Sequence, residues 1–356
     1  MTRVLLILLV LPLLCVAALA QTVAPPQLLP RPSTPPPGGT DRQIVLDVQV
    51  TDKSGAPVRG LQKQDFTLLD NGQPQDISSV QAIETTADAP VEMVLVVDMV
   101  NTPFRGVSFE REQVKKFLLG NGGKLSVPVS LVVFSETGTK VQNGSSRDGN
   151  TEAGVYDQFE AVLRSGNLTN GAQWGAAESV ELSLKSFMGI AKQEEKRPGR
   201  KLMIWLGRGW PVAGEGSLRT SKDSQQLFDW ITSLTTALRQ ARITLYSIDP
   251  VALRNAGAIR NSGYETFLKP ATSPSRAVPG NLALPVIAVQ SGGRVFNSSG
   301  DVNAAIADCI ADANWFYVFS FQGARASQAN EYHSLEIRVH KPGLKVRTRA
   351  GYYAQP

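Results

Sequence analysis

The chain has 356 residues, which is enough for one large domain or two modest domains, each with its own hydrophobic core. Charged residues make up 19% of the sequence, and the formal net charge is +5. Since Lys and Arg form no long run, the composition argues against a nucleic-acid partner.

The N-terminal segment 1–20 has the pattern of a secretory signal peptide. Arg3 precedes an apolar core, and Ala18-Leu19-Ala20 supplies the small residues for cleavage before Gln21. We therefore expect an exported protein, periplasmic or secreted, with no transmembrane span after cleavage; an uncleaved anchor is the alternative. Only Cys309 would then remain, so no internal disulfide is expected, and its apolar neighbours at helical spacing predict a buried packing residue.

Two β segments flank a longer central region. Residues 21–40 are a Pro-rich linker, and residues 41–88 form a β segment in which Asp70-Asn71-Gly72 predicts a tight hairpin turn. Residues 315–356 form a C-terminal β segment, with strands expected at 315–321, 332–340 and 344–348. Because neither segment is large enough to fold alone, we expect them to pack together as one smaller, discontinuous antiparallel β-sandwich.

The central region, residues 89–314, alternates strand-like and helix-like runs. Strands are expected at 93–97, 129–134, 202–206, 243–248 and 294–296, helices at 108–119, 175–192, 221–240, 282–290 and 301–313, and an antiparallel edge hairpin at 137–142. Such alternation predicts an α/β domain that is doubly wound around a mainly parallel sheet.

Polar residues follow two of these strands directly. The strand at 93–97 stops at Asp98, which Asn101 and Thr102 follow, and the strand at 202–206 runs into Gly207-Arg208-Gly209-Trp210. Open α/β folds place their binding sites beyond the carboxyl ends of strands. The two strand ends therefore predict one shared cleft.

Several segments of the mature chain form an ordered set: residues 50–61 running into Asp65-Phe66-Thr67, residues 70–75, Val97-Asp98-Met99-Val100-Asn101-Thr102, residues 246–250, residues 291–294 and residues 349–353. In this order, behind a signal peptide, they resemble the von Willebrand factor A-type (VWA) domain, and more closely the VWFA-related family known from acidobacterial proteins. The resemblance covers nearly the whole mature chain. It implies a VWA-like, Rossmann-like α/β domain that acts in protein binding or cell adhesion.

A-type domains commonly hold a divalent cation with an Asp-x-Ser-x-Ser run, a Thr from a second loop and an Asp after a later strand. Asp98 and Thr102 match the first run, but Val100 replaces its first Ser, and Arg208 stands where the family has Asp. The second loop offers Thr169, Asn170 or Gly171. A guanidinium repels a divalent ion, so the resemblance implies a degenerate site with no cofactor expected, Mg²⁺ or Ca²⁺ being the alternative. An internal Asp98–Arg208 ion pair is expected in the cation's place.

We therefore expect an exported, non-enzymatic module that binds a protein or an envelope component. The expected contact residues are Asp98, Asn101, Thr102, Arg208 and Trp210. The alternatives are a metal-dependent adhesin, a structural envelope component and a hydrolase. No catalytic residue is expected, because the sequence lacks a Gly-x-Ser-x-Gly elbow, His-Glu-x-x-His, Cys-x-x-Cys and a phosphate-binding Gly-rich loop.

Three features keep two interpretations each. Trp210 either contacts the partner or caps the sheet. The basic loop 254–279 either tunes partner choice or is disordered. Asp249 either lines the cleft or starts a turn. Glu194-Glu195 beside Lys196-Arg197 predicts a solvated helix end.

Overall fold

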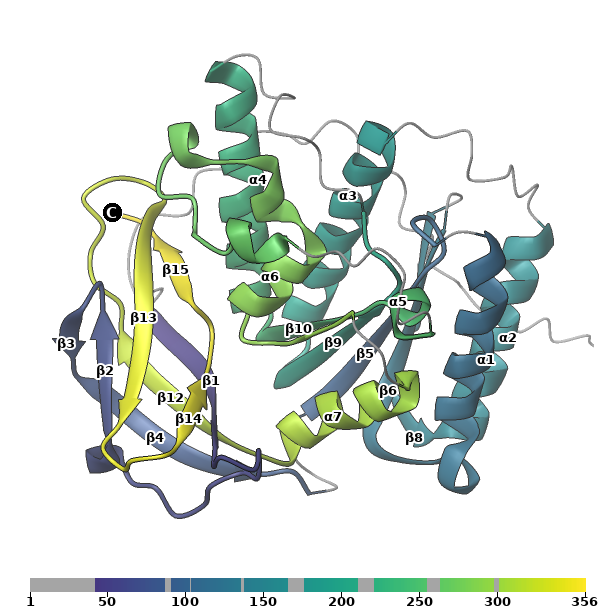
Figure 1. Cartoon of the computed structure of the whole chain (residues 1–356), viewed down its shortest axis with the longest axis horizontal. Coiled ribbons are helices and arrows are strands. Elements are labelled where there is room, and N and C mark those ends of the chain that lie inside the picture. Colours follow the sequence, from purple (N-terminus) through teal and green to yellow (C-terminus); the bar gives the residue numbers. More distant parts are fainter. Residues whose placement is uncertain are drawn as a thin grey trace, which may run out of the picture.

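A computed structural model describes residues 42–86, 91–102, 104–135, 138–165, 176–210, 221–254, 263–297 and 301–356. It combines a central sheet wrapped by helices with a β-sandwich beside it (Figure 1). The predicted fold class, a mainly parallel α/β sheet with a smaller antiparallel sandwich, is confirmed. Within the described residues, no helix combines the length and apolar character needed to cross a membrane.

The central sheet has seven strands in the order β11-β10-β9-β5-β6-β7, with β8 paired to β6. Their bounds are Val91–Asp98 for β5, Lys124–Ser135 for β6, Gly138–Val141 for β7, Ser146–Asp148 for β8, Arg200–Leu206 for β9, Ile243–Ile248 for β10 and Val295–Phe296 for β11. All neighbours from β11 to β6 are parallel, while β7 and β8 run antiparallel to β6. The expected parallel strands and edge hairpin are therefore present.

Helices cover both faces of this sheet. Along β5, Met93, Leu95 and Val97 belong to one core cluster, whereas Val94 and Val96 belong to the other. The first cluster takes in α1 (Phe104–Leu119), α2 (Gly149–Ser165) and α7 (Val302–Asn314); the second takes in α3 (Ala176–Glu195), α4 (Ser221–Gln240) and α6 (Leu284–Gln290). A strand buried on both faces is apolar at every position, which explains the unbroken run before Asp98.

The β-sandwich joins the two ends of the described chain. One four-stranded sheet has the order β14-β1-β12-β4, and the other has the order β15-β13-β2-β3. The bounds are Gln43–Thr51 for β1, Phe66–Asp70 for β2, Gln73–Gln75 for β3, Ile77–Glu84 for β4, Trp315–Gln322 for β12, Glu331–Val339 for β13, Lys345–Arg347 for β14 and Gly351–Ala354 for β15. β1 pairs with β12 and β2 pairs with β13, so both sheets mix N- and C-terminal strands.

Along the longer strands of the sandwich, such as β1 and β12, alternate side chains point into its core. Val48 on β1, Phe66 on β2 and Phe319 on β12 lie in one cluster, with the rings of Phe66 and Phe319 edge to face at 4.9 Å. The hairpin turn between β2 and β3 has left-handed φ angles of 49° at Asn71 and 77° at Gly72, as the Asn-Gly motif predicts.

Among the elements that were not predicted from the sequence are the helix α2 and the strand β15. The helix α2 follows Asp148. The Asp148 carboxylate accepts hydrogen bonds from the Asn150 backbone N–H and the Thr151 hydroxyl. This is a helix cap, and the sequence shows it as Asp148-Gly-Asn-Thr151. The strand β15 pairs with β13 and ends the chain in the sandwich. Its pattern Gly351-Tyr-Tyr-Ala354 does not alternate in polarity, because both of its faces are buried.

Candidate functional site

Asp98 ends β5 and is completely buried. Its Oδ1 accepts hydrogen bonds from the backbone N–H groups of Val100, at 3.1 Å, and Asn101, at 2.9 Å. A carboxylate that turns back onto the next N–H groups closes an Asx-type turn. The first polar residue after the strand therefore holds the loop that follows it.

The other carboxylate oxygen of Asp98 has two further donors. The Asn101 side-chain amide donates to Oδ2 at 2.8 Å, and the indole N–H of Trp205 donates to it at 2.9 Å. Trp205 reaches Asp98 because Val96, two residues before Asp98, is paired directly with Trp205 across β5 and β9, so both side chains lie on one face of the sheet. A carboxylate has about four acceptor positions, and these donors occupy them.

Burial raises the pKa of Asp98, and the hydrogen bonds from Asn101 and Trp205 act in the opposite direction. The neighbouring Gly207, at the end of β9, has a φ of 147°, and a Cβ there would lie 2.7 Å from the Asp98 Cβ. Any side chain at this position would therefore displace Asp98. Glycine here is a requirement of close packing between two strand ends.

Thr102 is also buried in this site. Its hydroxyl oxygen is 2.6 Å from the Asp98 carbonyl oxygen and 2.9 Å from Glu110 Oε1, on α1. The pKa of Glu110 is raised well above its ordinary value, first by burial and then by the charges of Asp98 and Asp249. A hydroxyl has one proton to donate. If Thr102 donates to the Asp98 carbonyl, a protonated Glu110 can donate the other hydrogen bond to the Thr102 oxygen.

The structure corrects two expectations about Arg208 and Trp210. Arg208 is exposed, whereas Asp98 is buried and bonded to other donors, so the expected Asp98–Arg208 ion pair is wrong. Trp210 is 4% exposed, and its indole N–H donates to the Leu282 carbonyl at 2.8 Å. It packs edge to face on Trp205 and caps the sheet, so it cannot act as an exposed contact residue.

The remaining contact candidates divide by burial. Asp98 and Thr102 are buried and position the loop, whereas Asn101 is half-buried and Arg208 is exposed. Asp249, after β10, accepts hydrogen bonds from the backbone N–H groups of Val251 and Ala252, which is the turn role. The second-loop candidates, Thr169, Asn170 and Gly171, lie outside the described residues.

The donor set around Asp98 fits a divalent cation poorly. A bound cation would need a carboxylate lone pair, and those of Asp98 already accept from N–H groups of Val100, Asn101 and Trp205. Val100 has no side-chain oxygen. In the part of the chain that the structure describes, no cluster of three or more His, Cys, Asp or Glu residues could hold a metal ion.

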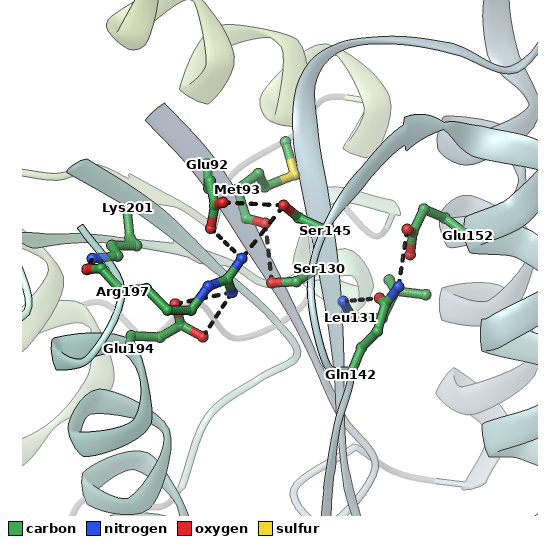
Figure 2. A network of polar contacts seen from close by, with 10 residues as sticks. All are labelled: Glu92, Met93, Ser130, Leu131, Gln142, Ser145, Glu152, Glu194, Arg197 and Lys201. Carbon is green, nitrogen blue, oxygen red and sulfur yellow. Dashed lines mark hydrogen bonds and ion pairs between the residues drawn. The ribbon is translucent and has the colours of Figure 1, made fainter. Parts of the chain in front are cut away.

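A second polar cluster lies at the amino ends of β5 and β9, the opposite edge of the sheet (Figure 2). Arg197 pairs with Glu92 at 2.5 Å and with Glu194 at 3.3 Å, and the Lys201 ammonium donates to the Arg197 carbonyl. Glu194 is fully buried, so the expected solvated helix end is wrong at this residue. Burial raises the pKa of Glu194 and lowers that of Lys201. The charged groups of this cluster pair with one another, and these pairs hold α3 against the sheet.

Two residues of the Asp98 site were missed by the sequence reasoning. Trp205 could have been found from the sequence. It lies two residues before Gly207, near the end of a strand that was expected to end beside Asp98, and side chains two residues apart in a strand lie on the same face. Glu110 could not have been found, because only the packing of α1 against the sheet brings it to Thr102.

No protein-family model and no curated protein matches the chain. Among solved structures, an aerotolerance-related membrane protein from Bacteroides fragilis is 11% identical with a TM-score of 0.32, and the match covers 63% of this chain and 98% of that chain. The manganese-loaded TRAP protein of Plasmodium vivax is 11% identical with a TM-score of 0.30, over 77% of this chain and 98% of that one. A human COPII-coat protein is 9% identical with a TM-score of 0.33, over 78% of this chain, which spans 46% of that chain. Similarity this low carries no argument about function, and membership of the acidobacterial family stays a prediction.

Proposed function

We propose that this protein is an exported, non-enzymatic module that binds a partner protein through the surface around Asn101 and Arg208. The observation that carries the proposal is the burial and internal hydrogen bonding of Asp98. Its carboxylate is buried and engaged by internal donors, and at the carboxyl ends of β5 and β9 the guanidinium of Arg208 is exposed and has no acidic partner among the described residues. An exposed Arg on a loop held by a rigid strand end suits recognition of a carboxylate on a partner.

The proposed interaction does not require a divalent cation. This is supported by the hydrogen bonds that occupy the oxygens of Asp98 and by the exposed cation at position 208. The competing function, a metal-dependent adhesin, would need Asp98 to exchange at least one of these donors for the ion. The N-terminal pattern Ala18-Leu19-Ala20 supports export.

The test is a quantitative pull-down from envelope extract with the mature chain as bait. Arg208→Glu reverses the charge that we assign to recognition, and Arg325→Glu makes the same change at an exposed arginine of the sandwich. We expect Arg208→Glu to reduce recovery of the partner about tenfold, as for a central interface Arg, and Arg325→Glu to leave it unchanged.

Two outcomes would contradict the proposal. Equal recovery with the wild type and Arg208→Glu would remove position 208 from the interface. Loss of the partner from wild-type bait in EDTA, with recovery on adding Mg²⁺ or Mn²⁺, would favour the metal-dependent adhesin instead.

A further inference from the structure

Residues 266–281, in the part of the chain that the structure describes after α5 (Pro250–Arg254), line a surface cleft of about 480 Å³. Three short 3-10 helices shape it: Tyr264–Phe267, Pro274–Arg276 and Pro279–Leu282. Its lining includes Phe267, Lys269, Thr272, Arg276, Val278 and Asn281. The volume is in the range of small-molecule sites, ~300–1,000 Å³. Loop 254–279 was expected either to tune partner choice or to be disordered. Its described part, from residue 263, is ordered.

The walls of the cleft are fastened to one another by Asn281. This buried side chain donates to the carbonyls of Phe267 and Lys269, at 3.0 Å each, and accepts from the Val278 N–H at 3.0 Å. The Phe267 ring lies on Gly280, where a Cβ would be 2.3 Å from the ring. The cleft is therefore pre-formed, which lowers the entropic cost of binding a ligand.

The cleft is also tied to the rest of the protein on two sides. The Tyr353 hydroxyl, on β15, donates to the Ala271 carbonyl at 2.8 Å. Trp210, beyond β9, donates to the Leu282 carbonyl. A site supported by both the sandwich and the central sheet is held more precisely than one on an isolated loop.

Two cations of the cleft lack carboxylate partners. Lys269 and Arg276 are exposed, and neither pairs with an acidic residue in the described part of the chain; the described lining residues include no Asp or Glu. Two unmatched cations at one concave surface concentrate anions there.

Apolar and hydroxyl groups complete the lining. Phe267, Pro270 and Val278 are half-buried and offer apolar surface, and the exposed Thr272 adds a hydroxyl. A bare inorganic anion would leave the apolar surface unused. A ligand that has both an apolar body and separate negative groups would use the whole lining.

We propose that this cleft binds a small organic dianion, a molecule with two carboxylate or phosphate groups on an apolar body. Lys269 and Arg276 each contact one anionic group, and Phe267 and Val278 contact the body. The site uses none of the residues that the proposed partner surface uses, so either proposal can fail without the other.

The test is titration of the purified mature chain with isophthalate by isothermal titration calorimetry. Isophthalamide, of the same shape but without charge, is the ligand control, and sulfate is the control for an anion without an apolar body. We expect isophthalate to bind with a Kd on the order of 1 mM, the level of a few modest contacts, and isophthalamide and sulfate to bind at least about tenfold more weakly.

Lys269→Met and Arg276→Met remove each charge but keep an apolar stem. We expect each to weaken isophthalate binding roughly threefold to tenfold, while Lys345→Met, at an exposed lysine of β14, leaves it unchanged. Since all three side chains are exposed, unchanged melting temperatures would show that the variants are folded. No isophthalate binding at 10 mM (about ten times the expected Kd), equal binding of isophthalamide or sulfate, or equal weakening by Lys345→Met would each overturn the proposal.

Discussion

The indole of Trp205 donates a hydrogen bond of 2.9 Å to the carboxylate of Asp98, and both side chains are completely buried. This bond joins the ends of β5 and β9, where the sequence led us to expect an ion pair with Arg208. A neutral donor from inside the core thus does what a charged side chain from the loop was expected to do. The guanidinium of Arg208 is left exposed.

Replacing Trp205 with Phe is expected to destabilise the protein by about 1–3 kcal/mol more than a matched change elsewhere. The substitution keeps an aromatic ring but leaves Asp98 Oδ2 without one of its donors in a buried site. The matched change is Trp230→Phe on α4, a half-buried tryptophan whose indole N–H has no hydrogen-bond partner among the described residues. Urea denaturation measures both. Equal losses for the two variants would mean that the Trp205–Asp98 bond adds no stability.

Glu152, on α2, should make stability depend on pH. It is buried, and its Oε1 accepts from the Gln142 amide at 3.0 Å (Figure 2). Burial, and then the charge of Asp148, raise its pKa above 4.5. The folded state therefore binds the proton more tightly than the unfolded state does, so stability is lost as pH rises from the unfolded pKa through the folded one.

Glu152→Gln should remove that loss. The variant should gain stability relative to wild type as pH rises from about 4.5, by at most about 1.4 kcal/mol per pH unit. Glu195→Gln, at the exposed end of α3, should follow the wild-type profile. Urea denaturation between about pH 4 and pH 7, a range that spans the ordinary Glu pKa, gives these profiles. Parallel curves for Glu152→Gln and wild type would contradict the prediction.

Gly280→Ala should destabilise the protein by about 1–3 kcal/mol, because the new methyl group would overlap the Phe267 ring. It should also weaken isophthalate binding by moving that ring. The control is Gly154→Ala on α2, where a Cβ meets nothing within 4 Å, and the better helix former should add about 0.5–1 kcal/mol. Thermal denaturation of both variants decides this, since the two are expected to shift in opposite directions.

Asp312 links the sandwich to the central domain. Its carboxylate pairs with Arg347 of β14 and, at 3.2 Å, with Arg294 next to β11. Asp312→Asn should destabilise the protein by about 1–3 kcal/mol, because two partly buried guanidinium groups would lose a charged acceptor. The Asp308 side chain is 62% exposed and lies 3.8 Å from Arg294. Asp308→Asn should therefore change stability by less than about 0.5 kcal/mol. If the two variants unfold at the same denaturant concentration, the Asp312 pairs contribute nothing.

Much of the fold could be predicted, because the spacing of apolar residues along the sequence indicates which face of each strand or helix is buried. β10 and α4 begin and end at the predicted residues, and the Asn71-Gly72 turn has the predicted backbone angles. The short strand β15 was not predicted, because both of its faces are buried and its residues therefore do not alternate in polarity. Cys309 is buried in the core, as its apolar neighbours predicted.

By itself, the sequence determined the order of most of the strands and helices, without α2 and β15, as well as the apolar faces and the meeting of polar residues at the carboxyl ends of β5 and β9. These follow from local periodicity and from the direction of parallel strands. Only the tertiary structure decided which of those polar residues face inward. Burial and partner choice depend on side chains from other elements, here Trp205, Glu110 and Leu282, and no local pattern around Asp98, Thr102 or Trp210 encodes them.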